Sequence, residues 1–242
     1  VQSGALPENA VDACARRVLK LVFRSAASLK NSTGYNEAAH HDLARQAAEA
    51  GAVLLKNDEQ LLPLHRSAKI AVIGHMAVQL RYQGAGSSHI NPTRVSQPLD
   101  YLPDAVYAAG CDGQGRTTEA LLAEAVRTAK EADTAVVFVG LPDRYESEGF
   151  DREDMKMPTG HLRMIQAVAD ANPNTAVVLL CGSAVECPWA DRVKAILYMG
   201  LPGQAGGEAI ANLLYGRVNP SGRLAESWPV RYEDCPSAPC YG

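Results

Sequence analysis

The sequence predicts an α/β fold, a three-layer α/β/α sandwich with a mostly parallel central sheet. Two observations support this prediction. Five short apolar runs rich in β-branched residues each end at a glycine, and segments with helical periodicity separate or follow them. Because these runs are continuously apolar, both faces of the sheet must be covered, which is typical of parallel sheets. The five runs are 69–74, 106–110, 135–140, 176–182 and 195–200.

Helical periodicity begins near the start of the chain. In residues 6–24, apolar side chains recur at helical spacing between Arg and Lys residues. Residues 25–36 are rich in Ser, Asn, Thr and Gly, which indicates a linker. A second helical pattern starts at Glu37 and leads into Val53–Asn57, which we interpret as an apolar turn. The clearest later helices are 117–132, 159–172 and 204–215.

Composition excludes several functional classes. The 242 residues are 47% hydrophobic, which is enough for a large core. The net charge is -4 and Lys and Arg do not cluster, so we expect no nucleic-acid partner and no membrane partner. No apolar run reaches the roughly 18 residues of a membrane span. The six cysteines form no CxxC pair, so we expect no metal, no cofactor and free thiols, although Cys235 and Cys240 could pair in an oxidising setting.

An acidic stretch, residues 145–152, follows the predicted strand 135–140. It contains Glu146, Glu148 and Asp151 within a few residues of one another. In parallel sheets, ligands bind beyond the carboxyl ends of the strands, where this stretch is expected to lie. Crowded carboxylates have raised pKa values, which suits a general acid working near neutral pH. Taken alone, these residues favour a solvated charged loop over a catalytic one.

A glycine-rich segment, residues 83–88, follows another predicted strand. Its spacing matches neither of the common nucleotide-binding patterns, and Asn91-Pro92 prevents a helix after it. A loop beside a pocket for a neutral ligand fits better, with Arg81, Ser87 and Ser88 as groups that could bind hydroxyls. Ser183 also follows a strand, but it lacks the flanking glycines of a serine-hydrolase nucleophile.

Several motifs occur together and in a recognisable order. They are residues 41–45 leading to 53–57 and 62–64; residues 73–74 with 81–88 and 91–93; residues 146–152 followed by Met157-Pro158; and residues 203–207 with 218–224 and Trp228-Pro229. With these motifs the chain resembles the C-terminal α/β sandwich domain of glycoside hydrolase family 3, which includes many β-glucosidases and β-xylosidases. The resemblance runs from about Leu6 to the end of the sequence.

The resemblance implies a retaining mechanism that uses two carboxylates. Glu148 would be the general acid/base because the residues after it match one branch of the family, and Glu146 is the alternate. Arg81, Gly86, Ser87 and Ser88 would contribute to substrate binding. The nucleophilic Asp of the family lies in a preceding (β/α)8 barrel, and this sequence has no Ser-Asp-Trp motif of that kind.

We therefore expect two parts. Residues 1–36 would be a terminal helix and linker from a missing upstream (β/α)8 barrel, and residues 37–242 would be the α/β sandwich domain. The expected function is that of the C-terminal domain of a retaining exo-β-glycosidase, a β-glucosidase acting on terminal β-glucosides or oligosaccharides. The isolated chain would be inactive, and its own barrel would be its partner.

Three other interpretations stay open. The chain could belong to a β-xylosidase of the same family, or it could be a non-catalytic carbohydrate-binding or scaffolding module. A nucleotide-binding α/β domain has only the glycine-rich loops in its favour. We expect a cytoplasmic location, with secretion not excluded, and a homodimer is left open.

Overall fold

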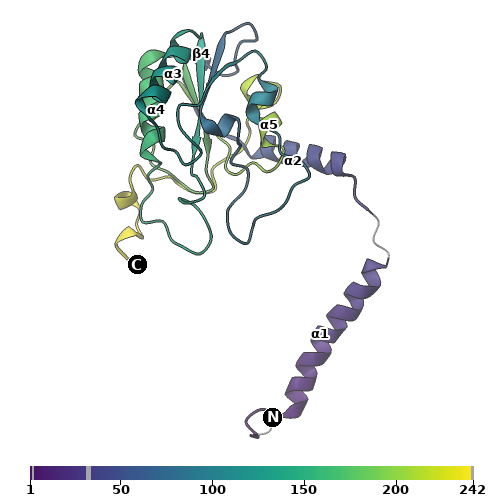
Figure 1. Cartoon of the computed structure of the whole chain (residues 1–242). Helices are drawn as coiled ribbons and strands as arrows, with labels where there is room; N and C mark the ends of the chain where they lie inside the picture. Colours follow the sequence, from purple (N-terminus) through teal and green to yellow (C-terminus); the bar gives the residue numbers. More distant parts are fainter. Residues whose placement is uncertain (2, 31–33, 241–242) are drawn as a thin grey trace. The chain divides into compact units, whose positions relative to one another are not determined.

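A computed structural model describes residues 1, 3–30 and 34–240. The chain divides into two compact units, Val1–Glu37 and Ala38–Gly242. The larger unit is built on a central sheet (Figure 1). This sheet has six strands in the order β1-β6-β5-β4-β2-β3. All neighbouring strands are parallel except β1 and β6. The strands are β1 Val53–Asn57, β2 Ile70–Ile73, β3 Val106–Ala108, β4 Thr134–Gly140, β5 Thr175–Leu180 and β6 Ala195–Tyr198.

Helices cover both faces of this sheet, as the continuous apolar strands require. Helices α3 (Glu119–Lys130) and α4 (Thr159–Ala171) pack on one face, and α5 (Gly206–Leu214) packs on the other (Figure 1). Successive residues of β4 point to opposite faces, so Val137 joins one core cluster and Phe138 the other. Every residue of β4 and β5 is buried. The predicted three-layer sandwich is therefore confirmed.

The first strand corrects one prediction. Residues Val53–Asn57, expected as an apolar turn, form the edge strand β1, which pairs antiparallel with β6. The register shifts between Leu54 and Lys56. The sequence hides this strand because it starts two residues after helix α2 (Glu37–Gly51), with no proline or turn cluster between them. Its pairing depends on β6, which lies far along the chain and leaves no local signal.

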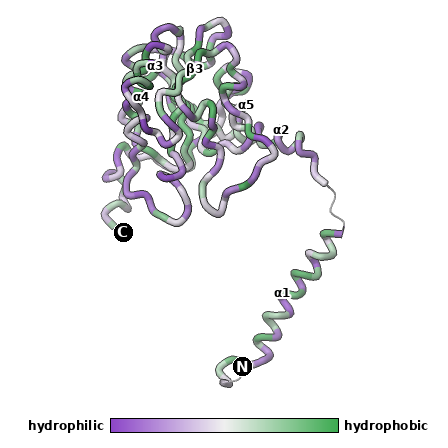
Figure 2. The backbone as a smooth tube through the Cα atoms, in the orientation of Figure 1, coloured by the Kyte–Doolittle hydropathy of each residue, from purple (hydrophilic) through white to green (hydrophobic). Residues whose placement is uncertain are grey.

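The N-terminal helix is longer than the sequence predicts. Helix α1 spans Glu8–Leu29, so the first residues of the expected linker 25–36 are helical. Ala26, Ala27 and Leu29 favour helix, and the apolar periodicity continues through them. Apolar and polar residues alternate along α1 in Figure 2. Residues 31–33 of the expected linker lie outside the described residues.

Within the described residues, no helix combines the length and apolar character needed to cross a bilayer. The same part of the chain has no group of His, Cys, Asp or Glu side chains that could hold a metal ion. All six cysteines are free thiols, including Cys235 and Cys240.

Gly140 ends β4 at a point where the chain has no room for a side chain. A Cβ atom there would lie 1.7 Å from the backbone oxygen of Leu180, its partner in β5. We expect Gly140→Ala to lower the free energy of unfolding by about 3 kcal/mol, because the strands must separate locally. Urea unfolding of the chain, followed by circular dichroism, measures the difference.

Gly51→Ala is the matched control for this prediction. A Cβ atom at Gly51 would meet nothing within 4 Å. We expect it to leave stability unchanged or to raise it by up to about 1 kcal/mol, because alanine restricts the unfolded chain. Equal unfolding midpoints for the two variants would contradict the close contact at Gly140.

Candidate active site

The acidic stretch and the glycine-rich loop meet beyond the carboxyl ends of the parallel strands. The backbone N–H of Glu148 donates to the carbonyl of Ala85 over 3.4 Å. The backbone N–H of Ser87 donates to Oε2 of Glu148 over 2.6 Å. Two segments that the sequence analysis identified separately as candidate site segments are thus in direct contact. Glu148 itself is exposed to solvent.

Gly86 makes this contact geometrically feasible. Its φ of +92° is unfavourable for residues with a side chain, and a Cβ atom there would lie 2.5 Å from Cβ of Glu148. The carboxylate can therefore approach the backbone of Ser87 only because residue 86 is glycine. Predicted residues Gly86, Ser87 and Glu148 form one group. Ser88 follows in the same exposed loop, with its Oγ beside Gly84.

The pKa of Glu148 moves in the direction opposite to the one the sequence suggested. Hydrogen bonds from Ser87 lower the pKa of the Glu148 carboxyl below its ordinary value. The larger effect comes from the Ser87 hydroxyl and the smaller one from its backbone N–H. The expected increase from crowded carboxylates is therefore wrong for this domain. Glu148 is exposed, and the carboxylate of Glu146 is bonded elsewhere, so neither burial nor a like charge opposes ionisation strongly.

Glu146 has a different environment although it is only two residues away. Its Oε2 accepts the backbone N–H of Gly182 over 2.9 Å, and its Oε1 accepts the hydroxyl of Ser183 over 2.8 Å. Both residues follow β5, the neighbour of β4 in the sheet. The side chain is half-buried, and both of its carboxylate oxygens are engaged by the protein.

Arg81 lies beneath the acidic loop, and only 9% of its surface is exposed. Its Nη1 forms an ion pair with Asp143, and its Nη2 donates to the carbonyl of Glu146 over 3.0 Å. Burial lowers the pKa of the guanidinium, although the nearby Glu146 charge opposes this effect. The arginine that the sequence predicted to bind substrate therefore fixes the start of the acidic loop.

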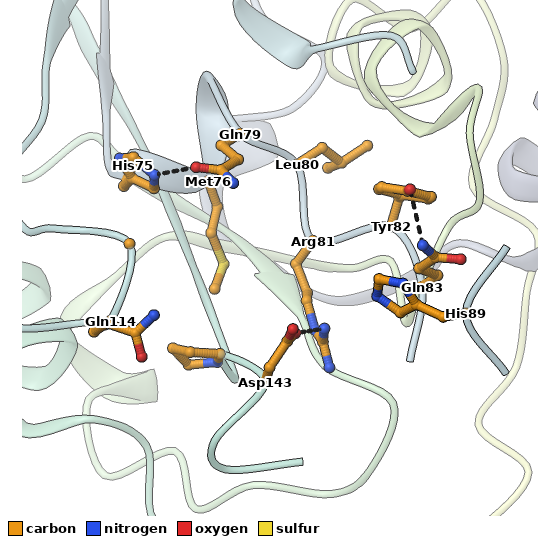
Figure 3. A pocket seen from close by; sticks show the side chains of 12 residues that line it. His75, Met76, Gln79, Leu80, Arg81, Tyr82, Gln83, His89, Gln114 and Asp143 are labelled. Carbon is orange, nitrogen blue, oxygen red and sulfur yellow. Dashed lines mark hydrogen bonds and ion pairs between the residues drawn. The ribbon is translucent and has the colours of Figure 1, made fainter. Parts of the chain in front are cut away.

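Arg81 and Asp143 also line a pocket of about 380 Å³ (Figure 3). Its walls come from segments that follow β2, β3 and β4, and they carry polar groups such as His75 and Gln114. His75 lies 2.8 Å from Oε1 of Gln79 across a hydrogen bond. The wall contains many donors and acceptors suited to a ligand rich in hydroxyls.

The sequence analysis missed the structural role of two residues in this region. Arg152 donates through Nη1 to Oγ of Ser183 over 2.8 Å and to the carbonyl of Ala184 over 3.0 Å. Ser183 was considered only as a nucleophile, and Arg152 lay in the acidic stretch 145–152 without a role of its own. Their position after β5 and at the end of the acidic stretch was the available signal.

The geometry can be compared with known proteins. A family model described as "Glycosyl hydrolase family 3 C-terminal domain" matches residues 52–242. The chain belongs to this family. The resemblance inferred from the motifs is confirmed, and the family match includes both the acidic loop and the glycine-rich loop.

Relatives in the family cover nearly all of the chain. Thermostable beta-glucosidase B of Acetivibrio thermocellus is 47% identical over 98% of this chain and 32% of its own length. Exo-alpha-(1->6)-L-arabinopyranosidase of Bifidobacterium longum is 41% identical over 98% of the chain and 33% of its own length. A crystal structure of a family 3 beta-glucosidase from Bifidobacterium adolescentis superposes with a TM-score of 0.92 at 42% identity, covering 98% of this chain and 36% of that one. The chain thus spans about a third of the length of these relatives.

Substitution of Gly86 tests the contact between the two loops. We expect Gly86→Ala to raise the pKa of Glu148 toward its ordinary value, because the new Cβ atom would displace the carboxylate from Ser87. The titration can be followed by carboxyl-carbon NMR of the labelled chain, with Glu148→Gln used to assign the signal. Gly84→Ala is the control, since its Cβ atom would meet the movable Oγ of Ser88 at 3.0 Å and Cδ1 of Leu201 at an ordinary contact distance of 3.9 Å. An unchanged pKa in Gly86→Ala would refute the role of this contact.

Proposed function

We propose that the chain is the C-terminal domain of a retaining exo-β-glycosidase, in which Glu148 is the general acid/base. The observation that carries this proposal is the placement of Glu148: its carboxylate is exposed beyond the sheet edge and fixed through one oxygen by Ser87. Such a group can reach a substrate while keeping a defined orientation. The alternate, Glu146, has both carboxylate oxygens bonded within the domain.

The proposed reaction has two steps. A nucleophilic carboxylate, supplied by a barrel domain outside this sequence, attacks the anomeric carbon while Glu148 donates a proton to the leaving glycosidic oxygen. Glu148 then removes a proton from water, which attacks the glycosyl-enzyme and releases the sugar and the free nucleophile. Retention requires the two carboxyl groups to lie about 5–5.5 Å apart.

The lowered pKa of Glu148 must be reconciled with its role as an acid. In this domain, Ser87 favours the ionised form. A second carboxylate close to Glu148 would oppose ionisation and raise its pKa, which would keep the proton available for the first step. Once the nucleophile is esterified, that charge is gone, and the influence of Ser87 would favour the base needed for the second step.

The names of the relatives support a proposal for the substrate. We favour a terminal β-glucoside or β-linked oligosaccharide because two of the relatives described above are named beta-glucosidases. Ser87, Ser88, Gly86 and Arg81 would border the sugar site. A cytoplasmic location is favoured by six cysteines that are all unpaired.

Removal of the carboxylate tests the assignment in the full-length enzyme. We expect Glu148→Ala to lower kcat/KM for alkyl β-glucosides by about 10²–10⁴-fold, because their leaving oxygen needs a proton. The loss should be much smaller for 2,4-dinitrophenyl β-glucoside, whose leaving group needs none. Azide should then increase turnover and yield the β-glucosyl azide, since it can occupy the space of the lost carboxylate.

Two further variants complete this test. Glu153→Ala removes an exposed carboxylate of the same loop and should leave kinetics unchanged. Glu146→Ala should give no glucosyl azide. If Glu148→Ala behaves like Glu153→Ala with every substrate, the assignment of Glu148 is wrong.

A further inference from the structure

Ser183 connects two charged side chains of the acidic loop. Its hydroxyl donates to Oε1 of Glu146 over 2.8 Å, and its Oγ accepts from Nη1 of Arg152 over 2.8 Å. A serine hydroxyl has one donor and two acceptor sites, so it can make both bonds at once. A neutral hydroxyl thus joins a carboxylate and a guanidinium.

Glu146 and Arg152 stand on either side of Glu148 in the sequence. The segment between them has little packing of its own: Gly149 has a φ of +94° with open space around it, and Phe150 is 49% exposed. Glu148 is therefore held by the anchors at the two ends of this segment and by its contacts with Ala85 and Ser87 in the glycine-rich loop. Both ends are anchored on Ser183.

Backbone groups reinforce this anchor on each side. The N–H of Gly182 donates to Glu146, and the carbonyl of Ala184 accepts from Arg152. Residues 182–184 begin two positions after the end of β5, whose six residues are all buried. The anchor is therefore attached to a strand that is buried along its whole length.

Loss of the Ser183 hydroxyl would leave both charged groups without one of their bonds. Arg152 is half-buried, and its Nη2 is already buried without a hydrogen-bond partner. A half-buried charge that loses a partner tends to move toward water to recover one. Such a movement of Glu146 or Arg152 would carry the segment that bears Glu148 with it.

We propose that Glu146, Ser183 and Arg152 form a clamp that positions Glu148 for proton transfer. They are positioning residues, and they act through Glu148 without touching the substrate. This inference rests on the proposed function of Glu148. It also assigns Glu146 a role other than the alternate acid/base, because its carboxylate is committed to Gly182 and Ser183.

The test uses the full-length enzyme and substrates whose leaving groups differ in basicity. We expect Ser183→Ala to lower kcat/KM for an alkyl β-glucoside by about 10- to 100-fold, which is the effect of displacing a catalytic group by about 1 Å. For 2,4-dinitrophenyl β-glucoside the loss should be less than about threefold, since its departure needs no proton. Ser183→Thr keeps the hydroxyl and should restore most of the rate with the alkyl substrate.

Azide separates positioning from direct proton transfer. Ser183→Ala and Glu146→Ala should give no glucosyl azide, because the carboxylate of Glu148 is still present. Glu148→Ala should give it. Glucosyl azide from Glu146→Ala but not from Glu148→Ala would overturn the clamp and leave a glycosidase whose acid/base is Glu146. If no variant changes how kcat/KM depends on the leaving group, the proposed function itself is overturned.

A purely structural role for Ser183 gives a different pattern. In that case Ser183→Ala would lower kcat/KM for both substrates by the same factor. That result would overturn the inference. If Ser183→Ala fails to fold, Arg152→Lys provides the second variant. Lysine keeps the positive charge but can make only part of the hydrogen bonds of the Arg152 guanidinium. It should give a smaller loss with the same dependence on the leaving group, and an equal loss for both substrates would again refute the clamp.

Discussion

The pairing of β4 with β5 determines where the acidic side chains can lie. The two strands run parallel through six paired residues and end together at Gly140 and Leu180. Because Gly140 has no side chain, the strands stay in close contact up to this edge. The loops that follow them leave the sheet side by side, so Glu146 of one loop can bond Gly182 and Ser183 of the other.

Two glutamates in one short stretch have different environments. Glu146 faces the neighbouring loop and uses both oxygens to bond it, whereas Glu148 faces outward and contacts the glycine-rich loop. The two glutamates differ because their hydrogen-bond partners differ, since the residue type is the same. A carboxylate with bonded oxygens stabilises a loop, while an exposed one that is fixed at one oxygen remains accessible for chemistry.

The sequence was sufficient for the sandwich because its main signals are local. The apolar runs that became β2 to β6 and the stripes of α3, α4 and α5 are visible within a few residues. Strand β1 was missed because its pairing with β6 involves residues distant in sequence. Glu148 and the glycine-rich loop could be selected from motifs, but their contact spans 61 positions, and no periodicity describes it.

The sign of the Glu148 pKa shift shows a further limit of sequence reasoning. Proximity in sequence suggested that neighbouring carboxylates would raise the pKa, but the Ser87 hydrogen bonds lower it. Counting charges along the chain cannot reveal which way each side chain points. The sign has a consequence for the proposed reaction: a domain that favours ionised Glu148 supplies a base, and its acid form depends on a second carboxylate nearby. Arrival and removal of that charge during the catalytic cycle would let one side chain serve both steps.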